Sequence, residues 1–119
     1  MLEAVFALLN DPQPLTVTHT GKPGKDIVTV EFANGIQAGV HLFMDIAPTF
    51  QLSLFGRNGW RLVDITNSYA MFRDNIIEFV RSVQEGRARL PFEKTAAIIN
   101  TLIAARESLV QGGKTILLK

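Results

Sequence analysis

The chain has 119 residues, 47% of them hydrophobic and 19% charged, a balance that excludes a disordered protein and indicates a globular one. Its 12 basic and 11 acidic residues give a net charge of +1 and lie scattered, so no basic surface for nucleic acid is predicted. The absence of cysteine excludes disulfides, thiolate nucleophiles and cysteine-based zinc sites. With no apolar run near the roughly 20 residues that span a bilayer and no signal-peptide pattern, we expect one cytoplasmic domain over residues 1–119, without nucleic-acid or membrane partners.

The first predicted element is a short helix at the N-terminus. Its apolar residues recur at helical spacing and are Leu2, Val5, Phe6, Leu8 and Leu9. The sequence Asn10-Asp11-Pro12 then ends the helix.

Residues 15–65 switch to the alternation of apolar and polar side chains that is typical of strands. Turn residues interrupt this alternation at 21–24, 33–35, 45–49 and 57–59. Strands joined by turns this short are expected to pair antiparallel.

The glycine-containing turns allow the strand register to be predicted. A three-residue loop with Gly35 in the left-handed conformation keeps the apolar residues on one face, whereas a two-residue turn mixes the faces. The pairs predicted from this choice are Phe32 with Ile36, Val30 with Ala38, and Val28 with Val40. The same choice at Gly59 pairs Leu54 with Leu62.

Two amphipathic helices are predicted next. Asn67 or Ser68 caps the first, and Gly86 ends it. Its apolar stripe consists of Tyr69, Phe72, Ile76, Phe79, Val80 and Val83. The second begins at Pro91 and ends at Gly112-Gly113. Its apolar stripe consists of Ala96, Ile99, Leu102, Ile103, Leu109 and Val110.

A last short strand is predicted from Thr115 to Leu118. The whole pattern predicts an α+β fold: an open, mainly antiparallel sheet of about five to six strands with two long helices packed on one face. The opposite sheet face is expected to carry Thr29, Glu31, Gln37, His41, Phe43, Gln51, Ser53 and Phe55, which Thr16, Thr18 and Thr20 could join. Aromatic side chains among neutral polar ones indicate an interface or ligand face, and the alternative is a solvated face with two exposed aromatic residues.

The residues offer no pattern for catalysis, cofactor binding or metal binding. Gly21-x-x-Gly24 and Gly56-x-x-Gly59 are interpreted as hairpin turns, whereas a dinucleotide-binding loop links a strand to a helix. His19 and His41 have no further metal ligand at a suitable spacing, so both are predicted to be surface or interface histidines. The chain alone is therefore expected to bind no cofactor.

Most of the chain resembles the C-terminal domain of the glucose–fructose oxidoreductase, inositol dehydrogenase and rhizopine-catabolism family (Gfo/Idh/MocA). The resembling segments are 32–35, 54–59, 75–86, 90–92, 102–112 and 115–118. In this family a helix with Phe near its close comes before a glycine and a proline, as Phe79 does here. The next helix closes with the alanine, serine and glycine that Ala104, Ala105, Ser108 and Gly112 match.

The resemblance implies a parent enzyme in which an N-terminal Rossmann domain binds NAD or NADP and is absent from these residues. In the family the sheet domain often mediates oligomerisation, and the substrate lies between the two domains. The family's catalytic lysine and acid/base histidine precede the segment that resembles Leu2–Leu9, so neither is assigned to a residue here. The first hypothesis is a substrate-side and oligomerisation domain of an oxidoreductase for a sugar or polyol-like molecule, inactive in isolation and expected to form a homo-oligomer.

The second hypothesis is a stand-alone α+β ligand-binding module that dimerises through its sheet face. In that module His41 and Gln51 would contact the ligand. A free-standing enzyme that uses His41 is disfavoured, because no partner base or nucleophile accompanies this histidine.

Overall fold

A computed structural model describes residues 2–10 and 12–118. The chain divides into two compact units. Met1–Asp45 together with Leu90–Lys119 form the first, which we call the sheet unit, and Ile46–Arg89 form the second, which we call the hairpin–helix unit. The expectation of a single domain over residues 1–119 stays a prediction.

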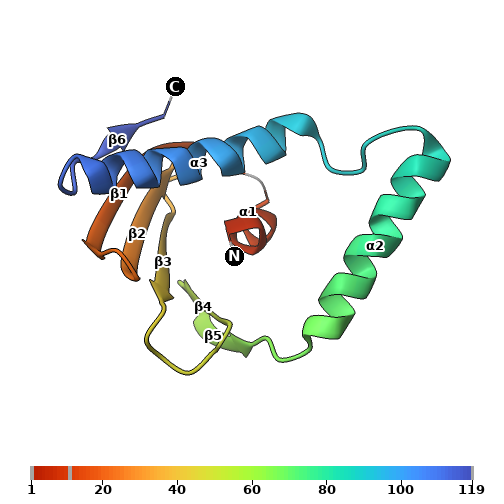
Figure 1. The fold of residues 1–119 in the computed structure, drawn as a ribbon, viewed down its shortest axis with the longest axis horizontal. Coiled ribbons are helices and arrows are strands. Elements are labelled where there is room, and N and C mark those ends of the chain that lie inside the picture. The colour runs from red at the N-terminus through yellow and green to blue at the C-terminus, as the bar shows by residue number, and fades with distance from the viewer. Residues whose placement is uncertain (1, 11, 119) are drawn as a thin grey trace. The chain divides into compact units, whose positions relative to one another are not determined.

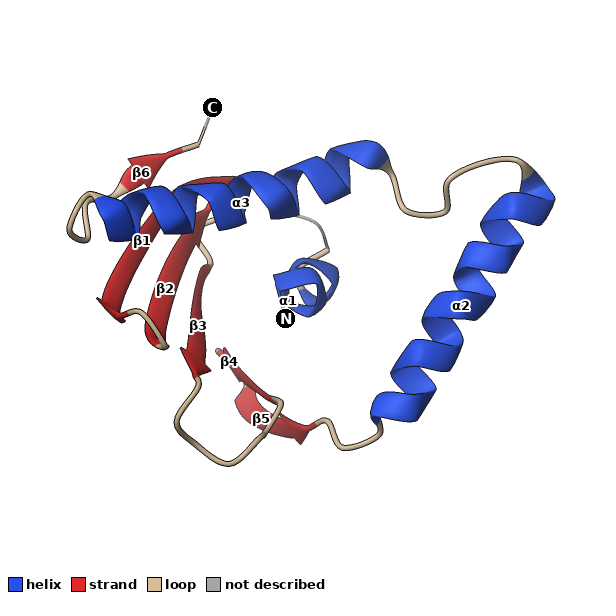
Figure 2. Ribbon diagram, in the orientation of Figure 1, coloured by secondary structure: helices blue, strands red, loops and turns tan. Residues whose placement is uncertain are grey.

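The sheet unit contains α1 (Leu2–Leu8), β1 (Pro14–Lys22), β2 (Lys25–Phe32), β3 (Gln37–Phe43), α3 (Phe92–Val110) and β6 (Ile116–Leu117) (Figure 1). The hairpin–helix unit contains β4 (Gln51–Gly56), β5 (Gly59–Asp64) and α2 (Ser68–Glu85) (Figure 2). All strand pairs among the described residues are antiparallel, and the predicted α+β class is confirmed. The described strands form a four-stranded sheet in the order β3-β2-β1-β6 and a separate β4-β5 hairpin.

The β2–β3 register follows the prediction. The N–H of Phe32 donates to the carbonyl of Ile36 over 2.9 Å, and Val28 lies opposite Val40. Gly35 has a φ of +82°, the left-handed conformation that this loop requires.

The predicted β4–β5 register is wrong. Leu54 pairs with Arg61 rather than Leu62, because the connection at residues 57–58 is a two-residue turn between Gly56 and Gly59. The shorter turn places Phe55 opposite Trp60 and Leu52 opposite Val63. Leu52 and Val63 form an aliphatic cross-strand pair of the kind that stabilises hairpins.

The core of the sheet unit lies between one face of the sheet and the helices α1 and α3. Its buried apolar residues are Leu2, Phe6, Val17, Val28, Val30, Phe32, Val40 and Ala104. The rings of Phe6 and Phe32 meet edge to face with their centroids 5.5 Å apart. This contact fixes the predicted N-terminal helix to the end of β2.

The helix α3 packs on β1 through small side chains, so the predicted apolar stripe is wrong for most of its members. The buried residues of α3 are Thr101, Ala104 and Ser108, which recur at helical spacing. The larger residues Ile99, Leu102, Ile103 and Val110 are exposed. Small side chains allow the helix to approach the sheet closely, and this close approach selects the face. Pro91, predicted as the first helical residue, instead occupies the N-cap position without a side-chain capping hydrogen bond, and the helix begins at Phe92.

The helix α2 has the predicted ends. The side chain of Asn67 accepts a hydrogen bond from the N–H of Ala70 over 3.0 Å, and Gly86 closes the helix with a φ of +66°. Its predicted apolar stripe is exposed, with 70% of Phe72 and 68% of Phe79 accessible. Because α2 belongs to the hairpin–helix unit, its packing on the sheet stays a prediction.

Candidate functional site

The sheet of β1, β2, β3 and β6 has one face on the core and a second face that we call the outer face. The outer face consists of the side chains of β1, β2 and β3 that alternate with the core residues. Its members are Thr16, Thr18, Thr20, Lys22, Lys25, Ile27, Thr29, Glu31, Gln37, Gly39, His41 and Phe43.

Five of the eight predicted face residues come together on the outer face. They are Thr29, Glu31, Gln37, His41 and Phe43. Gln51, Ser53 and Phe55 lie on β4 in the hairpin–helix unit, where they alternate with Leu52 and Leu54. Their membership in one shared surface with the other five stays a prediction.

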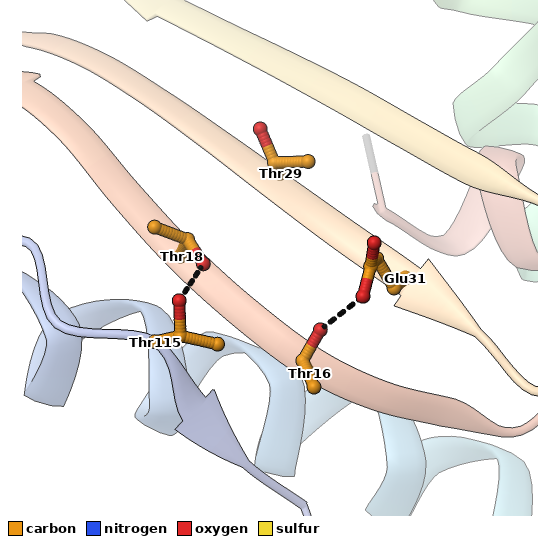
Figure 3. A pocket seen from close by; sticks show the side chains of 5 residues that line it. All are labelled: Thr16, Thr18, Thr29, Glu31 and Thr115. Atoms are coloured by element: carbon orange, nitrogen blue, oxygen red, sulfur yellow. Dashed lines mark hydrogen bonds between the residues drawn. The ribbon is translucent and has the colours of Figure 1, made fainter.

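Glu31 on β2 is held in place by hydrogen bonds from both neighbouring strands, and Figure 3 shows the one from Thr16 on β1. Its Oε2 accepts a hydrogen bond from Thr16 Oγ1 on β1 over 3.1 Å. Its Oε1 accepts one from Gln37 Nε2 on β3 over 2.7 Å. Both carboxylate oxygens therefore accept hydrogen bonds from neutral donors, which do not neutralise the negative charge. The side chain itself is exposed.

A hollow of about 290 Å³ lies on the outer face beside Glu31. Its lining consists of Thr16, Thr18, Thr29, Glu31 and Thr115 (Figure 3). The hydroxyls of Thr18 and Thr115 hydrogen bond to each other over 2.8 Å. Such a lining offers hydroxyl donors and acceptors together with one negative charge, which suits hydrogen-bonded recognition.

His41 lies on β3 opposite Ile27. Its ring and that of Phe43 are tilted at 57° with centroids 5.8 Å apart. Asp45, the nearest carboxylate in sequence, pairs with Lys25 over 2.9 Å. Among the described residues, no group of three or more His, Cys, Asp and Glu side chains is placed to hold a metal ion.

His19 is buried, and the prediction of a surface or interface histidine is wrong for this residue. Only 4% of it is exposed, because the alternation of β1 places it on the core face two residues after Val17. Its Nε2 and Asp26 Oδ1 are 2.7 Å apart. Asp26 Oδ2 in turn accepts a hydrogen bond from the N–H of Gly24 over 3.1 Å, which ties the pair to the β1–β2 turn.

Ser108 joins α3 to β1 and to the segment before β6. Its Oγ accepts a hydrogen bond from the N–H of His19 over 2.8 Å and donates one to the carbonyl of Lys114 over 2.6 Å. The sequence prediction did not assign Ser108 this bridging role. The signal that reveals it is the spacing of Thr101, Ala104 and Ser108 on one face of a helix.

The hairpin–helix unit carries an exposed ion-pair network. Arg89 binds both Glu78 and Glu85. The hydrogen bond with Glu78, followed by the charges of Glu78 and Glu85, raises the pKa of Arg89 above its ordinary value. This network ties the end of α2 to the segment that follows it.

No protein-family model and no curated protein matches the chain. Among solved structures, the chain is similar to the crystal structure of GenD2 from gentamicin A biosynthesis in complex with NAD. The two share a TM-score of 0.77 at 16% sequence identity, over 99% of this chain and 45% of GenD2. This similarity shows a common fold, and the chain spans less than half of the GenD2 length.

The helices in the described part of the chain are all too short or too polar to cross a membrane.

Proposed function

We propose that the chain is the substrate-side and oligomerisation domain of an NAD(P)-dependent oxidoreductase that acts on a sugar or polyol-like substrate. In this proposal a Rossmann domain elsewhere in the parent protein binds NAD or NADP, and the present chain is inactive in isolation. The observation that carries the proposal is the fold shared with the NAD-bound GenD2 over 99% of the chain.

The glycine pairs of the chain support the assignment of cofactor binding to another domain. Gly21 lies near the end of β1 and Gly24 in the turn between β1 and β2, and Gly56 and Gly59 flank the β4–β5 turn. A dinucleotide-binding loop instead joins a strand to the start of a helix, where the helix N-terminus meets the pyrophosphate. These two glycine motifs are hairpin turns and serve strand reversal.

The composition of the outer face supports an oligomerisation role. Threonine hydroxyls, Gln37 and His41 offer hydrogen bonds, and Phe43 and Ile27 add apolar area. Protein interfaces combine aromatic anchors with a hydrogen-bonding surround in this way. The sugar or polyol-like substrate rests on the family resemblance of the sequence.

The alternative is a stand-alone α+β ligand-binding module that dimerises through its sheet face. The hollow beside Glu31 favours this alternative, because its hydroxyls and carboxylate could bind a polar ligand without a second domain. The ligand contacts predicted from sequence, His41 and Gln51, lie in different units.

Two measurements on the purified chain test the proposal. We expect fluorescence titration to detect no saturable NADH or NADPH binding up to about 1 mM. A dissociation constant at that limit corresponds to a binding free energy of only about 4 kcal/mol. We expect light scattering to find a dimer or larger assembly. Tight nucleotide binding would contradict the first part, and a monomer would contradict the oligomerisation role. Saturation-transfer NMR tests whether the chain alone binds a polyol. A signal with the wild type that disappears in Thr18→Val would favour the alternative.

A further inference from the structure

The outer face carries opposite charges at the two ends of β2. Lys25 and Glu31 lie on the same side of the strand, since six residues separate them, and both are exposed. At about 3.3 Å per residue their positions are about 20 Å apart. The residues between them on this face are the uncharged Ile27 and Thr29.

The end of the face around Lys25 is basic. Lys22 on β1 lies directly opposite Lys25, so two ammonium groups project from neighbouring positions. Asp45 pairs with Lys25 and offsets one of these charges, which leaves the three groups with a sum of +1. This ion pair is exposed, with 63% of the Lys25 side chain accessible, and such pairs are weak enough to rearrange.

The end around Glu31 is acidic, and its geometry is set in advance. The hydrogen bonds from Thr16 and Gln37 orient the carboxylate without neutralising it. The outer face therefore has a negative end and a positive end, with uncharged residues between them.

We propose that a second copy of this chain stacks on the outer face with its β2 running antiparallel to the first β2. The twofold axis lies between the two sheets and runs across the strands at the level of Val28, midway between Lys25 and Glu31. Glu31 of each copy then faces Lys25 of the other, so the ion pair forms twice. This inference rests on the proposed oligomerisation role of the sheet face and specifies its register.

Among twofold arrangements that keep the strands of the two sheets aligned, charge selects this axis over the one parallel to the strands. An axis parallel to the strands would place Glu31 over Glu31 and Lys25 over Lys25, and like charges across an interface disfavour a complex strongly. Stacked sheets lie about 10 Å apart with strand directions within about 30° of each other, a separation that paired lysine and glutamate side chains bridge.

Charge reversal tests the register through the dimer dissociation constant, measured by sedimentation velocity. In Lys25→Glu both contacts become carboxylate pairs, and in Glu31→Lys both become ammonium pairs. We expect each variant to raise the dissociation constant at least about tenfold. An equimolar mixture of the two variants restores opposite charges at both contacts. We expect this mixture to form heterodimers with an affinity close to that of the wild type. The double variant that carries both Lys25→Glu and Glu31→Lys is expected to form homodimers with a similar affinity.

Controls separate the interface from the fold. Arg106→Glu and Glu107→Lys make the same charge changes at exposed positions of α3, on the core side of the sheet, and are expected to leave dimerisation unchanged. Circular dichroism verifies that each variant is folded. The glutamate in Lys25→Glu also lies beside Asp45 and is repelled by it within the same chain. This repulsion persists in the mixture of the two variants. A recovery of dimer affinity in the mixture is therefore explained only by the contact between chains.

Different results would contradict the proposed register and the proposed oligomerisation role. A wild-type dimer whose charge-reversed variants still dimerise, or whose mixture does not recover, would overturn the proposed register and leave assembly through the sheet face standing. A monomeric wild-type chain would overturn both the register and the oligomerisation role.

Discussion

The Ser108 hydroxyl connects α3 to two other backbone segments of the sheet unit. It is fully buried and serves as acceptor for His19 N–H and as donor to the Lys114 carbonyl. Gly113 lies beside it with a φ of +93°, and a β-carbon there would lie 3.1 Å from the carbonyl oxygen of His19. A small polar residue and a nearby glycine thus allow the end of α3 to sit directly against β1.

Replacement of Ser108 by alanine is predicted to destabilise the sheet unit. The His19 N–H and the Lys114 carbonyl both lose their partner, and an unsatisfied buried polar group costs about 1–3 kcal/mol. Urea unfolding measures the change in the free energy of unfolding. The matched control is Thr95→Ala on the exposed side of the same helix, where a change within about 0.5 kcal/mol is expected. Equal stabilities of the two variants would contradict the bridging role.

At the scale of elements, the turns decide the register of the strands. The β1–β2 turn has Pro23 and then Gly24 with a φ of +83°, the residues that a type II turn favours. Gly21, one residue before the end of β1, has a φ of +97° and lies against the backbone of Lys25. This close approach of two chains adds a steric requirement to the conformational one.

Alanine substitutions distinguish these two requirements. At Gly35 a β-carbon would meet open space, so Gly35→Ala is expected to cost only about 1–2 kcal/mol for the left-handed backbone. At Gly21 the β-carbon would overlap the carbonyl oxygen of Lys25, so a loss larger by at least about 2 kcal/mol is expected. Thermal unfolding of both variants measures the difference, and similar melting temperatures would show that the turn relaxes without cost.

The elements of this chain differ in how far their residue patterns predict them. Alternation predicted the strands, and the faces of β2 and β3 followed once Gly35 set the register. Asn58-Gly59 repeats the same dipeptide as Asn34-Gly35, yet its hairpin has a two-residue turn, so the dipeptide alone does not set the loop length. The buried side of α3 was mispredicted because burial there follows residue size at the contact with β1, whereas amphipathic patterns weigh hydrophobicity alone.

The candidate site was predictable to a similar extent. Strand alternation was sufficient to place Thr29, Glu31 and Gln37 together. The link from Thr115 to Thr18 was beyond prediction, because it joins residues 97 positions apart in the sequence. The burial of His19 followed from the same alternation but was obscured by its polar character, which Asp26 accommodates by a hydrogen bond.

At the scale of the whole molecule, the sheet unit is built from both ends of the sequence. β6 pairs with β1 through Thr16 opposite Leu117 and Val17 opposite Ile116. The hairpin–helix unit is therefore an insertion between two segments that share one core. Such an arrangement predicts that the sheet unit can fold without the inserted residues.

Replacement of residues 46–89 by a flexible linker of about 15 glycine and serine residues tests this independence. A linker of that length has a root-mean-square span of about 20 Å, enough for a surface connection. We expect the shortened protein to unfold cooperatively and to keep the dimerisation that we propose for the outer face. Circular dichroism and light scattering measure these properties. A protein without a cooperative transition would show that the two units depend on each other.

The anchoring of Glu31 lowers the entropy cost of binding at this side chain. A long acidic side chain normally samples several rotamers and must give up that freedom when it meets a cation. Two neighbouring strands already restrict this one through Thr16 and Gln37, so most of that entropy is lost during folding rather than during association. A positively charged group that binds this carboxylate therefore meets an acceptor that is already oriented, and less side-chain entropy is lost on binding.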